Sequence, residues 1–216
     1  MTKRYLNLAI AMTLPFFASI LYFKILDGHE LAPMIYLLAK VFILVFPLFF
    51  IRHLRPFRSV FRFDARELLF GTAVGAAVFL VGWLLIRIPF VLNMIDDAAP
   101  FVQSKGESFG VLQHYLLFAF VISFIHSMLE EYYWRWFVYG ASGTALLSSI
   151  AFSLHHYIVL DYYFTAPLAI IFTIAVALGG MLFCWLYARK GNIWGAWGAH
   201  VGADLLIFYV GSLLLA

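Results

Sequence analysis

Ionisable side chains interrupt the apolar C-terminal half of this chain in three short segments, and the first holds the adjacent glutamates Glu130 and Glu131, followed by Arg135. Neighbouring residues on an α-helix point about 100° apart, so the two glutamates cannot face the same partners. Glu131 and Arg135 are four residues apart and can form an ion pair on one helix face. Glu130 is then left to face another group, which makes its carboxylate a candidate general base.

The other two segments supply imidazoles. Phe152 and His156 share a helix face at a spacing of four residues, and so do His200 and Asp204. A carboxylate such as Glu130, combined with two imidazoles and a further polar group, is sufficient to activate a water molecule and to stabilise an oxyanion.

Each segment alone also has a purely structural interpretation. A Glu–Arg pair is common at helix ends, and a lone histidine in a membrane helix often only hydrogen-bonds to a neighbouring helix. Ionisable groups at membrane depth cost about 2.5 to 3.5 kcal/mol each on insertion scales and usually mark function. Three such segments in a chain this apolar therefore favour a catalytic site. His126 and His155 are alternative imidazoles that rank below the first set.

The elements that must position these groups are membrane helices. Of the 216 residues, 65% are hydrophobic and 12% are charged, and this leaves too little polar surface to cover a water-soluble globule. A spanning helix needs about 20 apolar residues. We predict an all-α fold, a polytopic transmembrane helix bundle with a polar intramembrane site, that forms a single integral-membrane domain over residues 1–216. Its segments, about seven, are expected at 5–26, 31–51, 67–92, 110–138, 141–157, 166–188 and 192–214.

The distribution of charge predicts the orientation of the bundle. The short connection between the second and third segments is basic, and such loops stay in the cytoplasm. Its cations are Arg52, Arg55, Arg58, Arg62 and Arg66. We therefore expect a cytoplasmic N-terminus. The membrane itself is expected to be the cytoplasmic membrane of a prokaryote. No nucleic-acid partner is expected, because the basic residues are clustered where membrane topology requires them.

The three polar segments resemble the CAAX-protease and bacteriocin-processing family of intramembrane proteases, also called the CPBP or Abi family. That family has the pattern E-E-x-x-x-R, then F-x-x-x-H, then H-x-x-x-N or a similar residue, on successive helices. In this chain the pattern reads Glu130, Glu131 and Arg135, then Phe152 and His156, then His200 and Asp204. The resemblance covers a motif-bearing core of about 110–214.

The resemblance implies an intramembrane endopeptidase that hydrolyses a peptide bond in a membrane-anchored or lipidated protein or peptide. In that mechanism Glu130 activates the attacking water and His156 helps to hold it. His200 and Asp204 stabilise the oxyanion or position the scissile carbonyl. A structural layer behind these groups consists of Glu131, Arg135 and Phe152.

Asp204 stands where many relatives have Asn. An ionised aspartate cannot donate a hydrogen bond, so it could serve an oxyanion only when protonated or through His200. We expect instead that Asp204 orients His200 by accepting its ring N–H.

The residues leave two catalytic types open. Glu130, His156 and His200 could supply the three protein ligands of a catalytic zinc ion. The same residues also support a glutamate mechanism without metal. We favour the reading without a cofactor and place zinc second.

The competing class is a non-enzymatic membrane protein, either a proton-coupled carrier or an immunity or scaffold factor. In such a protein, carboxylates and histidines within the membrane relay protons or connect helices. A carrier would be expected to show inverted repeats and helices broken by Gly or Pro in both halves. The sequence shows neither feature, which favours the protease.

Overall fold

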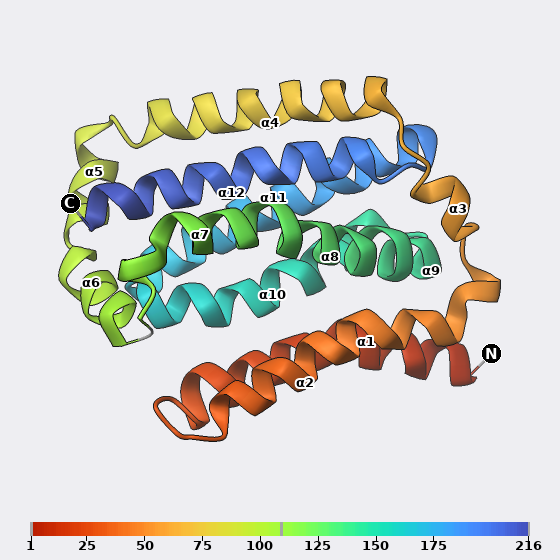
Figure 1. Ribbon diagram of the computed structural model, residues 1–216, viewed down its shortest axis with the longest axis horizontal. Helices are drawn as coiled ribbons and strands as arrows, with labels where there is room; N and C mark the ends of the chain where they lie inside the picture. Colours follow the sequence, from red (N-terminus) through yellow and green to blue (C-terminus); the bar gives the residue numbers. More distant parts are fainter. Residues whose placement is uncertain (1, 109, 216) are drawn as a thin grey trace.

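The computed structural model describes residues 2–108 and 110–215, and this part of the chain forms helices and no strand (Figure 1). The first half contains α1 (Thr2–Ile20), η1 (Leu21–Ile25), α2 (Ala32–Val45), η2 (Phe46–His53), α3 (Phe57–Val60), α4 (Ala65–Leu85), α5 (Pro89–Asp96) and α6 (Ala99–Ser108). The second half contains η3 (Leu112–His114), α7 (Tyr115–Phe120), η4 (Val121–His126), α8 (Ser127–Glu131), η5 (Tyr132–Tyr139), α9 (Gly140–Ser142), α10 (Ala145–Tyr163), α11 (Ala166–Lys190) and α12 (Trp194–Leu214).

Six helices in the described part of the chain are long and apolar enough to cross a membrane. They are Tyr5–Ile25, Ala32–His53, Ala65–Leu85, Leu112–Ser142, Ala166–Lys190 and Trp194–Leu214. This confirms the predicted transmembrane helix bundle and an integral membrane protein. The expected fifth segment corresponds to α10, which is 19 residues long and is not among the six. The number of seven crossings is therefore not confirmed.

The predicted third segment was too long at its C-terminal end. We expected it to run to residue 92, but α4 ends at Leu85. Ile88 has an extended ψ of 124°, because the ring of the following Pro89 disfavours helical backbone in the residue before it. Pro89 then opens the short helix α5, and α6 follows where a loop was expected.

The helix that carries the two glutamates alternates between α-helical and π-helical turns. The turns of η4 and η5 are π-helical, and α8 lies between them with Glu130 and Glu131 at its end. Such π turns often occur at functional sites, since they rotate side chains relative to an ordinary helix. Gly143 ends the helix with a φ of 69°, and α10 then packs against η5.

Glycines bring α4 and α12 into close contact, and the two helices run side by side in Figure 1. A Cβ atom on Gly71 would meet the backbone of Gly195, and a Cβ atom on Gly75 would meet the backbone of Gly198. Small residues allow this backbone approach between membrane helices. The contact fixes the position of α12, which carries His200.

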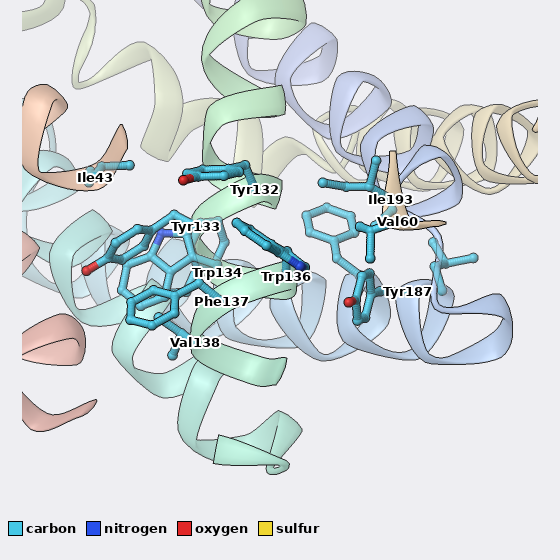
Figure 2. Packing of buried hydrophobic residues seen from close by; sticks show 14 of the residues in the cluster. Ile43, Val60, Tyr132, Tyr133, Trp134, Trp136, Phe137, Val138, Tyr187 and Ile193 are labelled. Atoms are coloured by element: carbon cyan, nitrogen blue, oxygen red, sulfur yellow. The ribbon is translucent and has the colours of Figure 1, made fainter. Parts of the chain in front are cut away.

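The largest buried apolar cluster surrounds η5, as Figure 2 shows. Two tyrosines of this segment also hold the N-terminal helices. The hydroxyl of Tyr133 donates to Ala11 O at 2.7 Å on α1, and the hydroxyl of Tyr132 donates to Leu44 O at 2.8 Å on α2. The helix that carries Glu130 is therefore anchored on the side facing α1 and α2.

Candidate active site

The carboxylate of Glu130 lies at the centre of a group of imidazoles drawn from three parts of the chain. Its side chain is buried, with only 4% of the residue exposed. Glu130 Oε1 lies 3.3 Å from His126 Nε2, 3.5 Å from His155 Nε2 and 4.0 Å from His156 Nε2. The other oxygen, Oε2, lies 3.6 Å from His200 Nε2. These separations bring the histidines of η4, α10 and α12 to one carboxylate.

Glu131 points to a different set of partners, as the angular offset of adjacent helical residues predicts. Its Oε2 lies 3.1 Å from Arg135 Nε, and its Oε1 lies 2.7 Å from His200 Nδ1. The guanidinium of Arg135 is fully buried and lies over the rings of Phe152, at 4.5 Å, and Phe183, at 5.2 Å. Glu131 thus connects the buried cation to the histidine of α12.

His200 is oriented by Glu131 and not by Asp204, which differs from our expectation. Because a carboxylate accepts, the 2.7 Å contact has His200 Nδ1–H donating to Glu131. Asp204 Oδ1 lies 3.7 Å from Nε2, beyond hydrogen-bond distance. The ring of His200 also stacks on Phe183 at 4.8 Å. Its Nε2 therefore faces Glu130 and Asp204 in a fixed orientation.

His156 is held by the backbone of its own helix. Its Nδ1–H donates to Phe152 O at 2.8 Å, so in the neutral ring Nε2 carries a lone pair and faces Glu130. The ring of Phe152 packs edge-on against His156 at 4.4 Å. Phe152 thus contacts His156 through both its carbonyl and its ring, and it also carries Arg135 on its face. These contacts are compatible with the structural role expected for Phe152.

His126 and His155, which we expected to be less important than His156, both lie closer to Glu130 than His156 does. His126 is on the same helix, four residues earlier, and the ring of His155 stacks on Trp134 with an interplanar angle of 7°. Sequence spacing indicated both as alternatives, but only the packing of α10 brings His155 into the group. Lys40 of α2 was missed, although its Nζ lies 3.5 Å from His126 Nε2. The sequence did contain a signal for Lys40, because it is the only charged residue in the apolar run 32–51.

The site offers a different set of possible metal ligands from the one predicted. Glu130, His155 and His156 each present one ligand atom, and these atoms lie within 4.8 Å of one another. Ligand atoms on one tetrahedral zinc ion lie about 3.3 Å apart, so the side chains fit such an ion after a small contraction. His200, a member of the predicted set, instead faces the second oxygen of Glu130. The donor types suit zinc, and the same arrangement also suits a water held by hydrogen bonds.

A comparison with protein families matches residues 112–206 to the family described as type II CAAX prenyl endopeptidase Rce1-like. The matched region contains all three polar segments of the site. Searches of curated proteins and of solved structures found no match. The expected resemblance to the CAAX-protease family is confirmed over this region.

Proposed function

We propose that this chain is an intramembrane protease in which Glu130 activates the water that cleaves a membrane-anchored or lipidated substrate, on the premise that residues 112–206 match the Rce1-like family of type II CAAX prenyl endopeptidases. The observation that carries the proposal is the buried carboxylate of Glu130 with four imidazole nitrogens at 3.3 to 4.0 Å. A water between these groups can donate to the carboxylate and to an imidazole lone pair. The carboxylate then acts as the general base that takes the proton, and the imidazole holds the water in position.

The chemistry of the step is hydrolysis. Glu130 takes a proton from water as the water oxygen bonds to the scissile carbonyl carbon. The tetrahedral intermediate then loses its amine as the C–N bond breaks, and the proton held by Glu130 passes to that amine. The products are a new carboxylate and a new amine, and Glu130 is returned to its starting state.

His200 is placed to stabilise the oxyanion. With Nδ1–H donated to Glu131, a protonated His200 has a second N–H at Nε2 directed into the site. Preorganised donors of this kind stabilise charge that develops in the transition state. Asp204 Oδ1 lies 3.7 Å from the same Nε2, and Arg135 balances the charge of Glu131.

Zinc is the second choice of catalytic type. Glu130, His155 and His156 are the residues that would hold the ion, and a bound zinc ion supplies Lewis acidity and a water of lowered pKa. Metal analysis of the purified protein, together with cleavage measured before and after treatment with a chelator, separates the two types. Retained cleavage in a metal-free preparation supports the glutamate mechanism.

The protease is tested with purified protein in vesicles and a peptide whose fourth residue from the C-terminus is an S-farnesylated cysteine, the arrangement of a CAAX motif. Mass spectrometry of the products identifies the cleaved bond. We expect wild type and Glu30→Gln, which alters an exposed glutamate far from the site along the chain, to cleave equally, and Glu130→Gln to bind the peptide without cleaving it. Equal cleavage by Glu130→Gln would refute the assignment, and binding without cleavage by all three proteins would favour the carrier or scaffold class.

A further inference from the structure

Lys40 is a charge in a membrane helix that the proposed mechanism does not use. It is the only charged residue in residues 32–51, and it belongs to the membrane-spanning helix Ala32–His53. A lysine near the centre of such a helix costs about 2.5 to 3.5 kcal/mol on insertion scales, and such residues usually face a protein interior or a polar cavity. The position of its ammonium group therefore calls for a functional reason.

The ammonium of Lys40 is directed towards the candidate active site. Its Nζ lies 3.5 Å from His126 Nε2 and 4.9 Å from the centre of the Tyr36 ring. His126 Nε2 is also the atom that contacts Glu130 Oε1, at 3.3 Å. Because both groups touch the same nitrogen, Lys40 Nζ lies within about 7 Å of the Glu130 carboxylate.

The ammonium of Lys40 forms no direct ion pair in the described part of the chain. No carboxylate of these residues lies within 4.0 Å of Lys40 Nζ, unlike Arg135, which has Glu131. His126 Nε2 can accept from Lys40 or donate to Glu130, but it cannot do both in one protonation state. Whenever His126 donates to Glu130, the ammonium is left without a hydrogen-bond acceptor among the described side chains. A cation in this situation can bind an anion that arrives from outside.

We propose that Lys40 binds the C-terminal carboxylate of the substrate and makes the enzyme selective for cleavage near a free C-terminus. The proposal rests on the proposed function, since a CAAX substrate ends three residues after its prenylated cysteine. Three residues span at most about 10 Å, so a chain with its scissile carbonyl beside Glu130 can bring its terminal carboxylate to Lys40. Lys40 is thereby a specificity-determining residue supplied by α2, which lies outside the matched residues 112–206.

The test compares two substrates that differ only in terminal charge. One is the farnesylated CAAX peptide with a free carboxylate, and the other is the same peptide with a C-terminal carboxamide. Wild type, Lys40→Met and Lys40→Arg are assayed on both peptides in vesicles, with Lys24→Met as a matched control. Lys24 is a half-exposed lysine of η1 that pairs with Asp161 on α10.

We expect wild type and Lys24→Met to prefer the free carboxylate by about tenfold or more in kcat/KM, the value of one charge-assisted hydrogen bond. Lys40→Met should lose this preference by cleaving the carboxylate peptide as slowly as the carboxamide, chiefly through a raised KM. Lys40→Arg, which keeps the charge, should retain most of the preference. A purely structural role would instead lower cleavage of both peptides by the same factor.

The outcomes separate this inference from the proposed function. If wild type cleaves the two peptides equally, or if Lys40→Met keeps the preference or slows both reactions alike, the role of Lys40 is wrong while the protease stands. If wild type cleaves neither peptide, the proposed function fails for this substrate class and the role of Lys40 fails with it.

Discussion

The contact between α4 and α12 can be tested with the substitution Gly71→Ala. A Cβ atom at this position would lie 2.0 Å from Gly195 O, whereas real Cβ atoms essentially never come within 3.0 Å of another heavy atom. The obstructing atom belongs to the backbone, so no side-chain rotation can relieve the overlap. The two helices have to separate locally by about 1 Å.

The expected loss of stability follows from two opposing terms. Overpacking of a tight contact costs about 1 to 3 kcal/mol, while Ala gains up to about 1 kcal/mol over Gly in a helix. Because the overlap is with backbone, the upper part of the overpacking range applies, about 2 to 3 kcal/mol, and the net loss is about 1 to 2 kcal/mol. At about 2 to 4 °C per kcal/mol for a chain of this size, the melting temperature should fall by about 2 to 8 °C. A displacement of α12 also moves His200, and misplacement by about 1 Å can cost about a hundredfold in rate.

The matched control is Gly179→Ala on α11. Its Cβ atom would meet only Phe183, at 3.8 Å, so this variant gains helix propensity without overlap. Unfolding can be followed with a thiol-reactive dye, because Cys184 is the sole cysteine and is fully buried. The reasoning is refuted if Gly71→Ala melts at or above the temperature of Gly179→Ala.

Two further predictions concern the buried ion pair and the departure from the family pattern. Arg135→Met removes the cation that pairs with Oε2 of the buried Glu131 and should lower stability by about 3 to 5 kcal/mol. Adding Glu131→Gln to that variant should recover part of the loss; thermal unfolding measures both, and no recovery would show that charge is not the cause. Asp204→Asn should retain cleavage within about tenfold of wild type, because Glu131 and not Asp204 holds the ring of His200; a larger fall in kcat would return the orienting role to Asp204.

The membrane bundle could be predicted from the sequence because its signal is the length of apolar runs, which is fixed by bilayer thickness. Helix ends could be predicted less well. The apolar residues of the third predicted segment continue beyond Leu85, but Pro89 prevents the helix α4 from continuing. The fifth segment was expected to end at residue 157, and α10 in fact continues to Tyr163, which places His156 inside the helix and not at its end.

Sequence spacing indicated most of the polar groups that the structure brings together, but only one of their pairings. Spacing of four residues indicated the contact between Glu131 and Arg135, because both lie on one helix. It could not indicate that Glu131 also receives His200 Nδ1–H, since that contact depends on how α12 packs on α8. Spacing instead suggested Asp204 as the partner of His200, because these two residues are four apart on one helix. Lys40 was missed because it lies on α2, about 90 residues from Glu130 in the chain.

The central claim is that the carboxylate of Glu130 removes the proton from the attacking water. It is tested most directly by the single-turnover rate of cleavage of the farnesylated peptide by Glu130→Gln relative to wild type, with the melting temperature of both proteins measured in parallel. A general base contributes about 10² to 10⁴ in rate, so the account predicts a fall of at least about a hundredfold with little change in stability. A rate within about threefold of wild type would contradict it.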